Sequence, residues 1–173
     1  MKVFLAGGSG VIGRRLVPLL ASRGHDVIAT VHNPDKAEAL RALGASPLVM
    51  EGLDRAAVHE ALSKSRPDVV VHQMTALADV TSFKQLDAVM AQSNRLRTEG
   101  TQHLLEGARA AGVKRFVAQS FTGWPNVRRG GPVKTEEDPL DPSPAPTMVQ
   151  TMQAIGTLER SVLSAADLSG VVL

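Results

Sequence analysis

The stretch Lys2-Val3-Phe4-Leu5-Ala6-Gly7-Gly8-Ser9-Gly10-Val11-Ile12-Gly13 decides the fold of this chain. It begins with a short apolar run typical of a buried strand and ends in the first turn of an apolar-periodic helix. Between them, Gly7 permits a tight turn, Gly10 lets the backbone approach a pyrophosphate, and Gly13 lets the helix pack closely on the sheet. The N-terminus of the helix, at Val11 and Ile12, offers N–H groups to the phosphates. The stretch therefore predicts a dinucleotide-binding loop.

Short Val- and Leu-rich runs alternate with amphipathic segments of helix length along the rest of the chain. This alternation predicts repeated β-α units, and hence a Rossmann-type doubly wound parallel sheet in a three-layer α/β/α fold. We expect residues 1–173 to form a single domain. The expected strands are Lys2–Ala6, Asp26–Val31, Pro47–Met50, Asp68–His72, Arg115–Gln119 and Gly170–Leu173, and the expected helices are Val11–Ser22, Pro34–Leu43, Arg55–Lys64, Phe83–Ala111 and Met148–Ala166.

Composition excludes several classes of function. The sequence has no cysteine, which excludes disulfides, thiolate metal sites and cysteine nucleophiles, and we assign no residue to a metal. Its net charge of +2 is spread among acids and forms no basic stripe for nucleic acid. The apolar start ends at Gly7, too early for an export signal, and no run approaches the roughly 18 apolar residues of a membrane span. We expect a cytoplasmic protein that acts on a small molecule and binds neither nucleic acid nor membrane.

The residues after the second expected strand bear on which dinucleotide binds. An acid there accepts a hydrogen bond from the ribose 2′-OH of NAD, whereas basic groups favour the 2′-phosphate of NADP. His32 and Lys36 follow this strand with no acid at its end, and Arg14 follows the third glycine. NADP is therefore favoured over NAD, although Lys36 could instead be a solvated surface charge. Asp35 is interpreted as a residue of the next helix's first turn.

Four further segments follow the glycine loop at intervals that indicate a family: residues 51–54 (EGLD), 72–77 (HQMTAL), 116–120 (FVAQS) and 135–139 (TEEDP). Together with the loop they resemble the extended short-chain dehydrogenase/reductase superfamily, and more narrowly its NAD(P)-dependent epimerase/dehydratase family. The resemblance implies a cofactor site with Glu51, Gly52 and Leu53 near the adenine and with Thr75 and Ala76 along the ribose. It also implies that Asn94 helps to hold the backbone of the site and that Ser120 occupies the position of the catalytic serine. Glu51 departs from the usual aspartate.

Each of these residues also has a plainer interpretation. Glu51 could be solvated, and His72 on a buried strand could be a satisfied core histidine. Asn94 could bond within its own helix, and Ser120 could cap the end of its strand. Their order and spacing behind the glycine loop favour the family over these alternatives.

The chemistry that the resemblance implies is incomplete. The family uses a tyrosine followed four positions later by a lysine, but this sequence contains no tyrosine. Alignment on residues 156–159 (GTLE) puts Thr151 and Ile155 at the two positions. Three explanations stay open. The first is an oxidoreductase on a small carbonyl or sugar-like substrate, with Ser120, Thr122 or a water as proton donor and His72 as a more distant candidate. The second is a non-catalytic NADP-binding regulator or sensor, and the third is a partial chain without the family's C-terminal substrate-binding portion.

Apolar stripes run along the fourth and fifth expected helices. The resemblance implies that these two helices pair across the axis of a homodimer; the alternative is that the stripes only cover the sheet. The stripe residues are Leu86, Val89 and Met90 on one helix and Met152, Leu158 and Val162 on the other.

Overall fold

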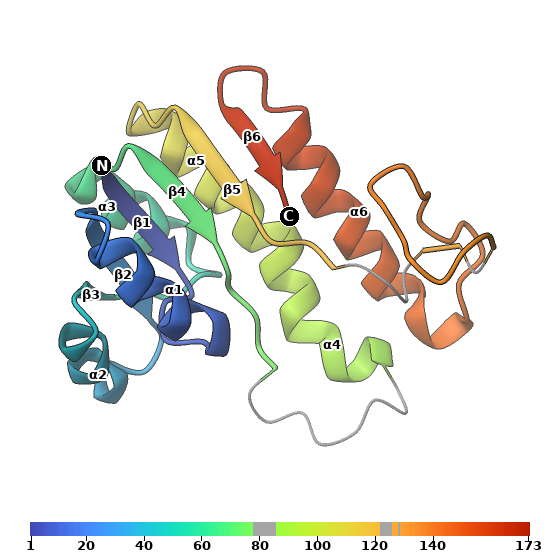
Figure 1. The fold of residues 1–173 in the computed structure, drawn as a ribbon, viewed down its shortest axis with the longest axis horizontal. Helices are drawn as coiled ribbons and strands as arrows, with labels where there is room; N and C mark the ends of the chain where they lie inside the picture. Colours follow the sequence, from blue (N-terminus) through green and yellow to red (C-terminus); the bar gives the residue numbers. More distant parts are fainter. Residues whose placement is uncertain (78–85, 122–125, 128) are drawn as a thin grey trace.

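The computed structural model describes residues 1–77, 86–121, 126–127 and 129–173. One parallel sheet of six strands has the order β3-β2-β1-β4-β5-β6 (Figure 1). The order reverses beside β1, so the carboxyl ends of β1 and β4 flank the crevice in which open α/β sheets bind their ligands. The strands are β1 (Lys2–Ala6), β2 (Asp26–Val31), β3 (Ser46–Val49), β4 (Val69–His72), β5 (Arg115–Ala118) and β6 (Ser169–Val172).

Two apolar clusters lie on opposite faces of the sheet. Side chains alternate between faces along a strand, so Phe4 of β1 joins one cluster and Leu5 joins the other, both with 0% exposure. One face is covered by α1 (Val11–Ala21) and α2 (Ala37–Ala42), and the other by α3, α5 and α6. The structure therefore confirms the three-layer Rossmann-type fold. The remaining helices are α3 (Arg55–Ser65), α4 (Leu86–Arg95), α5 (Thr101–Ala110) and α6 (Val149–Leu163), with short turns at η1 (Pro34–Lys36) and η3 (Pro146–Met148).

The single helix predicted over Phe83–Ala111 is wrong as a continuous α-helix. Helix α4 is joined to α5 by a π-helical turn, η2 (Leu96–Gly100), and Phe83 lies outside the described residues. A π turn adds a residue to the helical turn and shifts the register of the side chains. Within this turn the adjacent residues Leu96 and Arg97 are both buried, with 8% and 5% exposure.

The stripes expected to form a homodimer interface are largely internal. Met90, Met152, Leu158 and Val162 have exposures of 6% or less within the single chain, and α4 packs against α6. Pairing of these helices across a dimer axis stays a prediction. Within the described part of the chain, no helix is both long and apolar enough to cross a bilayer.

Candidate functional site

The glycine loop is built as its sequence predicts. Gly7 has a φ of +91°, and a Cβ there would lie 2.7 Å from the Gln73 carbonyl carbon. The Gly7 N–H donates to Thr30 Oγ1 at 2.9 Å, which ties the turn to β2. A Cβ at Gly13 would lie 2.5 Å from the Gly7 oxygen, whereas one at Gly10 would meet only that oxygen, at 3.3 Å. Gly7 and Gly13 are thus required by packing, and Gly10 leaves an open approach to the backbone.

The N-terminus of α1 fits an anionic ligand. Its first helical hydrogen bond runs from the Arg14 N–H to the Gly10 oxygen, so the preceding N–H groups have no intrahelical acceptor. No side chain caps this end, and its first turn carries no acid. Val11 and Ile12 are 76% and 47% exposed, although apolar residues of this size are usually covered. These features suit a pyrophosphate on the N–H groups with the rest of a dinucleotide lying over the apolar side chains.

A cavity of about 430 Å³ extends from this helix terminus to the carboxyl ends of β4 and β5. It brings together six of the predicted site residues: Gly10, Val11, Ile12, Gly13, Thr75 and Ser120. Ala76 is outside the lining, but its N–H donates to Ser93 Oγ on α4 at 2.9 Å and fixes the segment after β4. The rest of the lining is formed by His72, Gln73, Met74, Leu77, Arg97, Gln119, Phe121 and Leu158.

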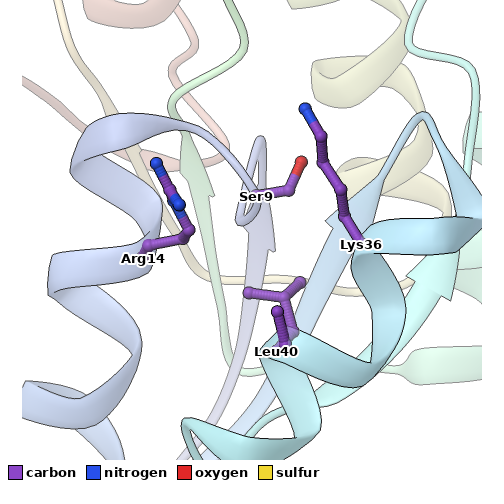
Figure 2. A pocket seen from close by; sticks show the side chains of 5 residues that line it. Ser9, Arg14, Lys36 and Leu40 are labelled. Atoms are coloured by element: carbon purple, nitrogen blue, oxygen red, sulfur yellow. The ribbon is translucent and has the colours of Figure 1, made fainter.

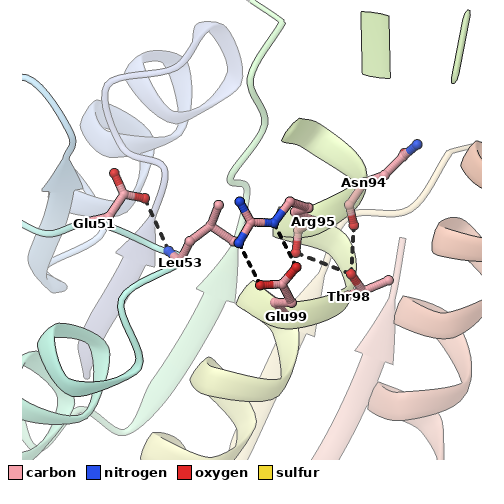
Figure 3. Close-up of polar contacts among 6 residues, drawn as sticks. All are labelled: Glu51, Leu53, Asn94, Arg95, Thr98 and Glu99. Carbon is pink, nitrogen blue, oxygen red and sulfur yellow. Dashed lines mark hydrogen bonds and ion pairs between the residues drawn. The ribbon is translucent and has the colours of Figure 1, made fainter. Parts of the chain in front are cut away.

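Glu51 joins the ends of β2 and β3. Its Oε2 lies 2.8 Å from His32 Nδ1, and its Oε1 accepts a hydrogen bond from the Leu53 N–H at 3.2 Å. Figure 3 shows Leu53 facing Arg95 of α4, which is held by two 2.8 Å hydrogen bonds to Glu99. At Gly52, a Cβ would lie 2.5 Å from Met74 Sδ, so this position is closely packed. The predicted adenine-side residues therefore form one connected edge, with His32 held by Glu51.

A smaller cavity, of about 140 Å³, lies beside the glycine loop and is lined by Ser9, Arg14, Lys36, Ala39 and Leu40. In Figure 2 the Ser9 hydroxyl, the Arg14 guanidinium and the Lys36 ammonium all extend to the same side of Leu40. Arg14 and Lys36 make no ion pair with any described residue. Two cations and a hydroxyl around one hollow form a suitable setting for a phosphate.

His72 is a buried, neutral histidine. Burial lowers its pKa to about 4, with the Leu96 carbonyl acting in the opposite direction and the Arg97 charge lowering it further. Its Nδ1 accepts a hydrogen bond from the Met74 N–H at 3.2 Å, so the neutral ring carries its proton on Nε2. Nε2 makes no hydrogen bond of normal geometry with a described residue. The ring is therefore uncharged near neutral pH, with the Leu96 carbonyl as the neighbouring acceptor for its Nε2–H.

Ser120 lines the cavity, and its hydroxyl donates to Glu159 Oε1 of α6 at 2.5 Å. This pairing fits either a cap on the strand end or a proton relay, and a catalytic role for Ser120 stays a prediction. Thr122 lies outside the described residues.

The two positions aligned with the family's tyrosine and lysine have structural roles: Thr151 belongs to a hydrogen-bond network and Ile155 to the hydrophobic core. Thr151 is 0% exposed and Ile155 is 1% exposed. Thr151 Oγ1 donates to Asp87 Oδ1 at 2.8 Å and accepts from Asn94 Nδ2 at 3.0 Å. Burial raises the pKa of Asp87, but hydrogen bonds from Thr151 and from the Gln150 N–H outweigh it and leave that pKa below its ordinary value. Asn94 thus bonds across to α6 and not only within its own helix.

Sequence reasoning missed Arg97, the charged side chain of the main cavity. Its Nη1 donates to Asn94 Oδ1 at 3.1 Å. The available signal was periodicity: Arg97 falls at helical spacing between Asn94 and Thr101, so it occupies the inward face.

Fold and site together define a dinucleotide-binding protein of the Rossmann class. The chain matches the NAD(P)H-binding family over residues 7–164 and belongs to it. It is 46% identical over 175 residues to a 3-diazoavenalumate denitrifying reductase of a Streptomyces species, covering 100% of this chain and 55% of that protein. It is 35% identical over 117 residues to a Stigmatella aurantiaca 4-hydroxy-2-methyl-3-oxo-4-farnesyl-3,4-dihydroquinoline-1-oxide ketoreductase, covering 68% and 32%.

Solved structures agree on the fold. The Thermotoga maritima UDP-glucose 4-epimerase with UDP-glucose superposes with a TM-score of 0.76 at 21% identity, covering 99% of this chain and 54% of that one. The Brucella ovis UDP-glucose 4-epimerase with NAD gives 0.76 at 21% identity, covering 95% and 47%. The chain therefore has structural neighbours in the NAD-dependent epimerase/dehydratase group of the short-chain dehydrogenase/reductase superfamily. It spans about half the length, or less, of these relatives.

Proposed function

We propose that this protein binds NADPH and uses it to reduce a small organic acceptor. The observation that carries the proposal is the continuous cavity of about 430 Å³, in which the N-terminus of α1 faces the ends of β4 and β5. The α1 N–H groups would hold the pyrophosphate, and Thr75 and Ser120 would lie along the nicotinamide half. Relatives named as reductases support a catalytic role over a purely regulatory one.

The preference for NADPH over NADH is argued from the smaller cavity. Arg14 and Lys36 lie there without acidic partners in the described part of the chain, and Ser9 adds a hydroxyl donor. Glu51, which follows β3, is engaged by His32 at the end of β2 and by the Leu53 N–H. A ribose 2′-phosphate would supply the missing negative charge, whereas a 2′-hydroxyl would leave both cations unpaired.

Arg14→Ala and Lys36→Ala test this preference. We expect each to weaken NADPH binding about 10-fold, the scale of a lost charge-assisted hydrogen bond, and to change NADH binding less than about 2-fold. Arg15→Ala is the matched control, because it removes an exposed arginine from the next position of the same helix. Titration of nicotinamide fluorescence measures the affinity of wild-type protein and of each variant for NADPH and for NADH. Equal losses for NADPH and NADH would contradict the assignment.

One difference from the family bears on the acceptor class. Reduction of a carbonyl produces an alkoxide that needs a proton, and Thr151 and Ile155 offer no acid of suitable pKa where the family has its tyrosine and lysine. We propose a diazo-substituted acceptor, as in the name of the Streptomyces relative. In that chemistry a bound reduced nicotinamide would supply a hydride to the carbon bearing a diazonium group, and the C–N bond of that carbon would break with the electron pair leaving on dinitrogen. No proton donor is required.

A two-armed assay tests the acceptor. NADPH consumption is followed with an aryl diazonium carboxylate and with the matching aryl ketone, and dinitrogen is quantified in the first arm. We expect one dinitrogen per NADPH oxidised, and no turnover of the ketone. Reduction of the ketone alone would overturn the diazo assignment and favour Ser120, paired with Glu159, as a proton source. Tight NADPH binding with no turnover in either arm would overturn the reductase proposal.

A further inference from the structure

Arg97 is a buried cation on an irregular piece of helix. It is 5% exposed, lines the main cavity, and belongs to the π-helical turn η2 between α4 and α5. π turns are uncommon and concentrate at functional sites. Arg97 keeps helical spacing with the buried residues Asn94 and Thr101, so it lies on the inward face of the helix, where core packing alone would favour an apolar side chain.

The guanidinium is poorly compensated. Of its five N–H donors, one bonds to Asn94 Oδ1 at 3.1 Å, and no described carboxylate pairs with it. Burial lowers the pKa of Arg97 from its ordinary value. Arg97 therefore lies mostly buried at the cavity with one neutral hydrogen-bond acceptor among the described residues, and its other N–H groups can take a further acceptor. An anion bound in the cavity would supply the acceptors for these remaining N–H groups and would explain why an arginine occupies this buried position.

A chain of hydrogen bonds holds this group in place. Asn94 presents its carbonyl oxygen to Arg97 because its amide nitrogen donates to Thr151 Oγ1 at 3.0 Å. Thr151 Oγ1 donates in turn to Asp87 Oδ1 at 2.8 Å. The fork is therefore oriented from α6 as well as from its own helix, which reduces the conformational entropy lost when a ligand binds.

The surroundings specify the ligand's chemistry. The neutral His72 lines the same cavity without adding a charge. Met74, Leu77 and Leu158 form apolar walls of the same cavity. The guanidinium suits a carboxylate, which it binds through two parallel hydrogen bonds, and the walls suit an unsaturated or aromatic body.

We infer that Arg97 is a substrate-binding residue, whose guanidinium holds the carboxylate of a small apolar acid beside the cofactor. This rests on the proposed function, because it places an acceptor next to the nicotinamide half of the cavity. The cofactor's own anions have other donors: the α1 N-terminus for the pyrophosphate, and Arg14 with Lys36 for a 2′-phosphate. Arg97 would then provide a positive charge in a site where the family has a lysine and this chain has Ile155.

Binding, measured without turnover, tests the inference. Cinnamate and its neutral isostere cinnamamide are titrated by calorimetry into the protein, with and without saturating NADP⁺. We expect wild-type protein to prefer cinnamate by at least about 10-fold, and Arg97→Gln to lose that preference. Arg97→Lys, which keeps the charge but not the fork, is expected to retain only part of it. Arg115→Gln is the matched control, since it removes an exposed arginine at the amino end of β5 and should behave as wild type.

Three outcomes would overturn the inference. The first is equal affinity of wild-type protein for cinnamate and cinnamamide. The second is that Arg97→Gln and Arg97→Lys both prefer cinnamate over cinnamamide as strongly as wild-type protein does. Two variants are used so that poor folding of one does not decide the result. The third is a large loss of NADP⁺ affinity in Arg97→Gln with the cinnamate preference intact, which would assign Arg97 to the cofactor. Because none of these measurements requires catalysis, a failure of the diazo reductase assay leaves their result unaffected.

Discussion

Gly10→Ala and Gly13→Ala add the same methyl group to the same loop, yet the structure predicts different consequences. At Gly13 the new Cβ would lie 2.5 Å from the carbonyl oxygens of both Gly7 and Gly8, which are backbone atoms of a fixed turn. Overpacking of this kind costs about 1–3 kcal/mol, of which about 1 kcal/mol is offset by the better helix propensity of alanine. In a domain of this size each kcal/mol corresponds to about 2–4 °C in Tm. We expect Gly13→Ala to lower Tm by several degrees. We also expect it to lose cofactor binding, because the geometry of the loop changes.

At Gly10 the backbone has φ −71° and ψ 173°, which alanine adopts readily, and the Cβ would meet only the Gly7 oxygen, at 3.3 Å. Replacing an N-cap glycine by alanine costs at most about 1 kcal/mol, so Tm should fall by no more than about 4 °C. The methyl group would occupy the side from which a pyrophosphate approaches the helix N-terminus. NADPH affinity should therefore fall at least about 10-fold in a well-folded protein.

The assay is thermal unfolding by circular dichroism with and without NADPH, together with a fluorescence titration of NADPH. Gly131→Ala is the control, because its added Cβ would have no atom within 4 Å. The reasoning is refuted if Gly10→Ala binds NADPH as wild type does. It is also refuted if Gly13→Ala keeps both the Tm and the affinity of the wild-type protein.

Two further predictions concern buried polar groups. The native pKa of His72, about 4, lies below the ordinary value of 6.5, so the unfolded chain binds the additional proton between these pH values and the native state loses stability as pH falls through this window. The stability of wild-type protein relative to His72→Gln, from urea unfolding, should fall by about 2–3 kcal/mol between about pH 7 and about pH 4.5, and a constant difference would contradict this. Thr151→Val keeps the shape of the side chain but leaves the buried amide of Asn94 without its acceptor, so we expect a loss of about 1–3 kcal/mol in the urea-derived free energy of unfolding with an unchanged m-value. Thr151→Ser, which keeps the hydroxyl, is the control, and equal losses in the two variants would show that packing and not hydrogen bonding is responsible.

Local geometry made much of the fold predictable. The bounds of β1 and β2 agree with the sequence prediction, because their apolar runs end at glycine or polar residues that cannot continue a buried strand. The glycine loop was predictable for the same kind of reason, since φ at Gly7 and the close approach at Gly13 are properties of a few consecutive residues. The break in the long helix was not, because the π turn at Leu96–Gly100 forms where α4 and α5 pack against other elements.

The sequence by itself determined that a dinucleotide loop joins β1 to α1, and it located Arg14, Lys36 and Ser120 as candidates around it. Tertiary structure alone decided which side chains meet. Arg97 lies in one cavity with Ser120, His32 pairs with Glu51, and Asp87 anchors Thr151 from 64 residues away. Periodicity gives the face on which a residue lies, but not the element packed against that face. The partners of these side chains depend on how the helices pack on the sheet. Because of that packing, Thr151, at the position of the family's tyrosine, forms structural hydrogen bonds, and Arg97 lines the cavity.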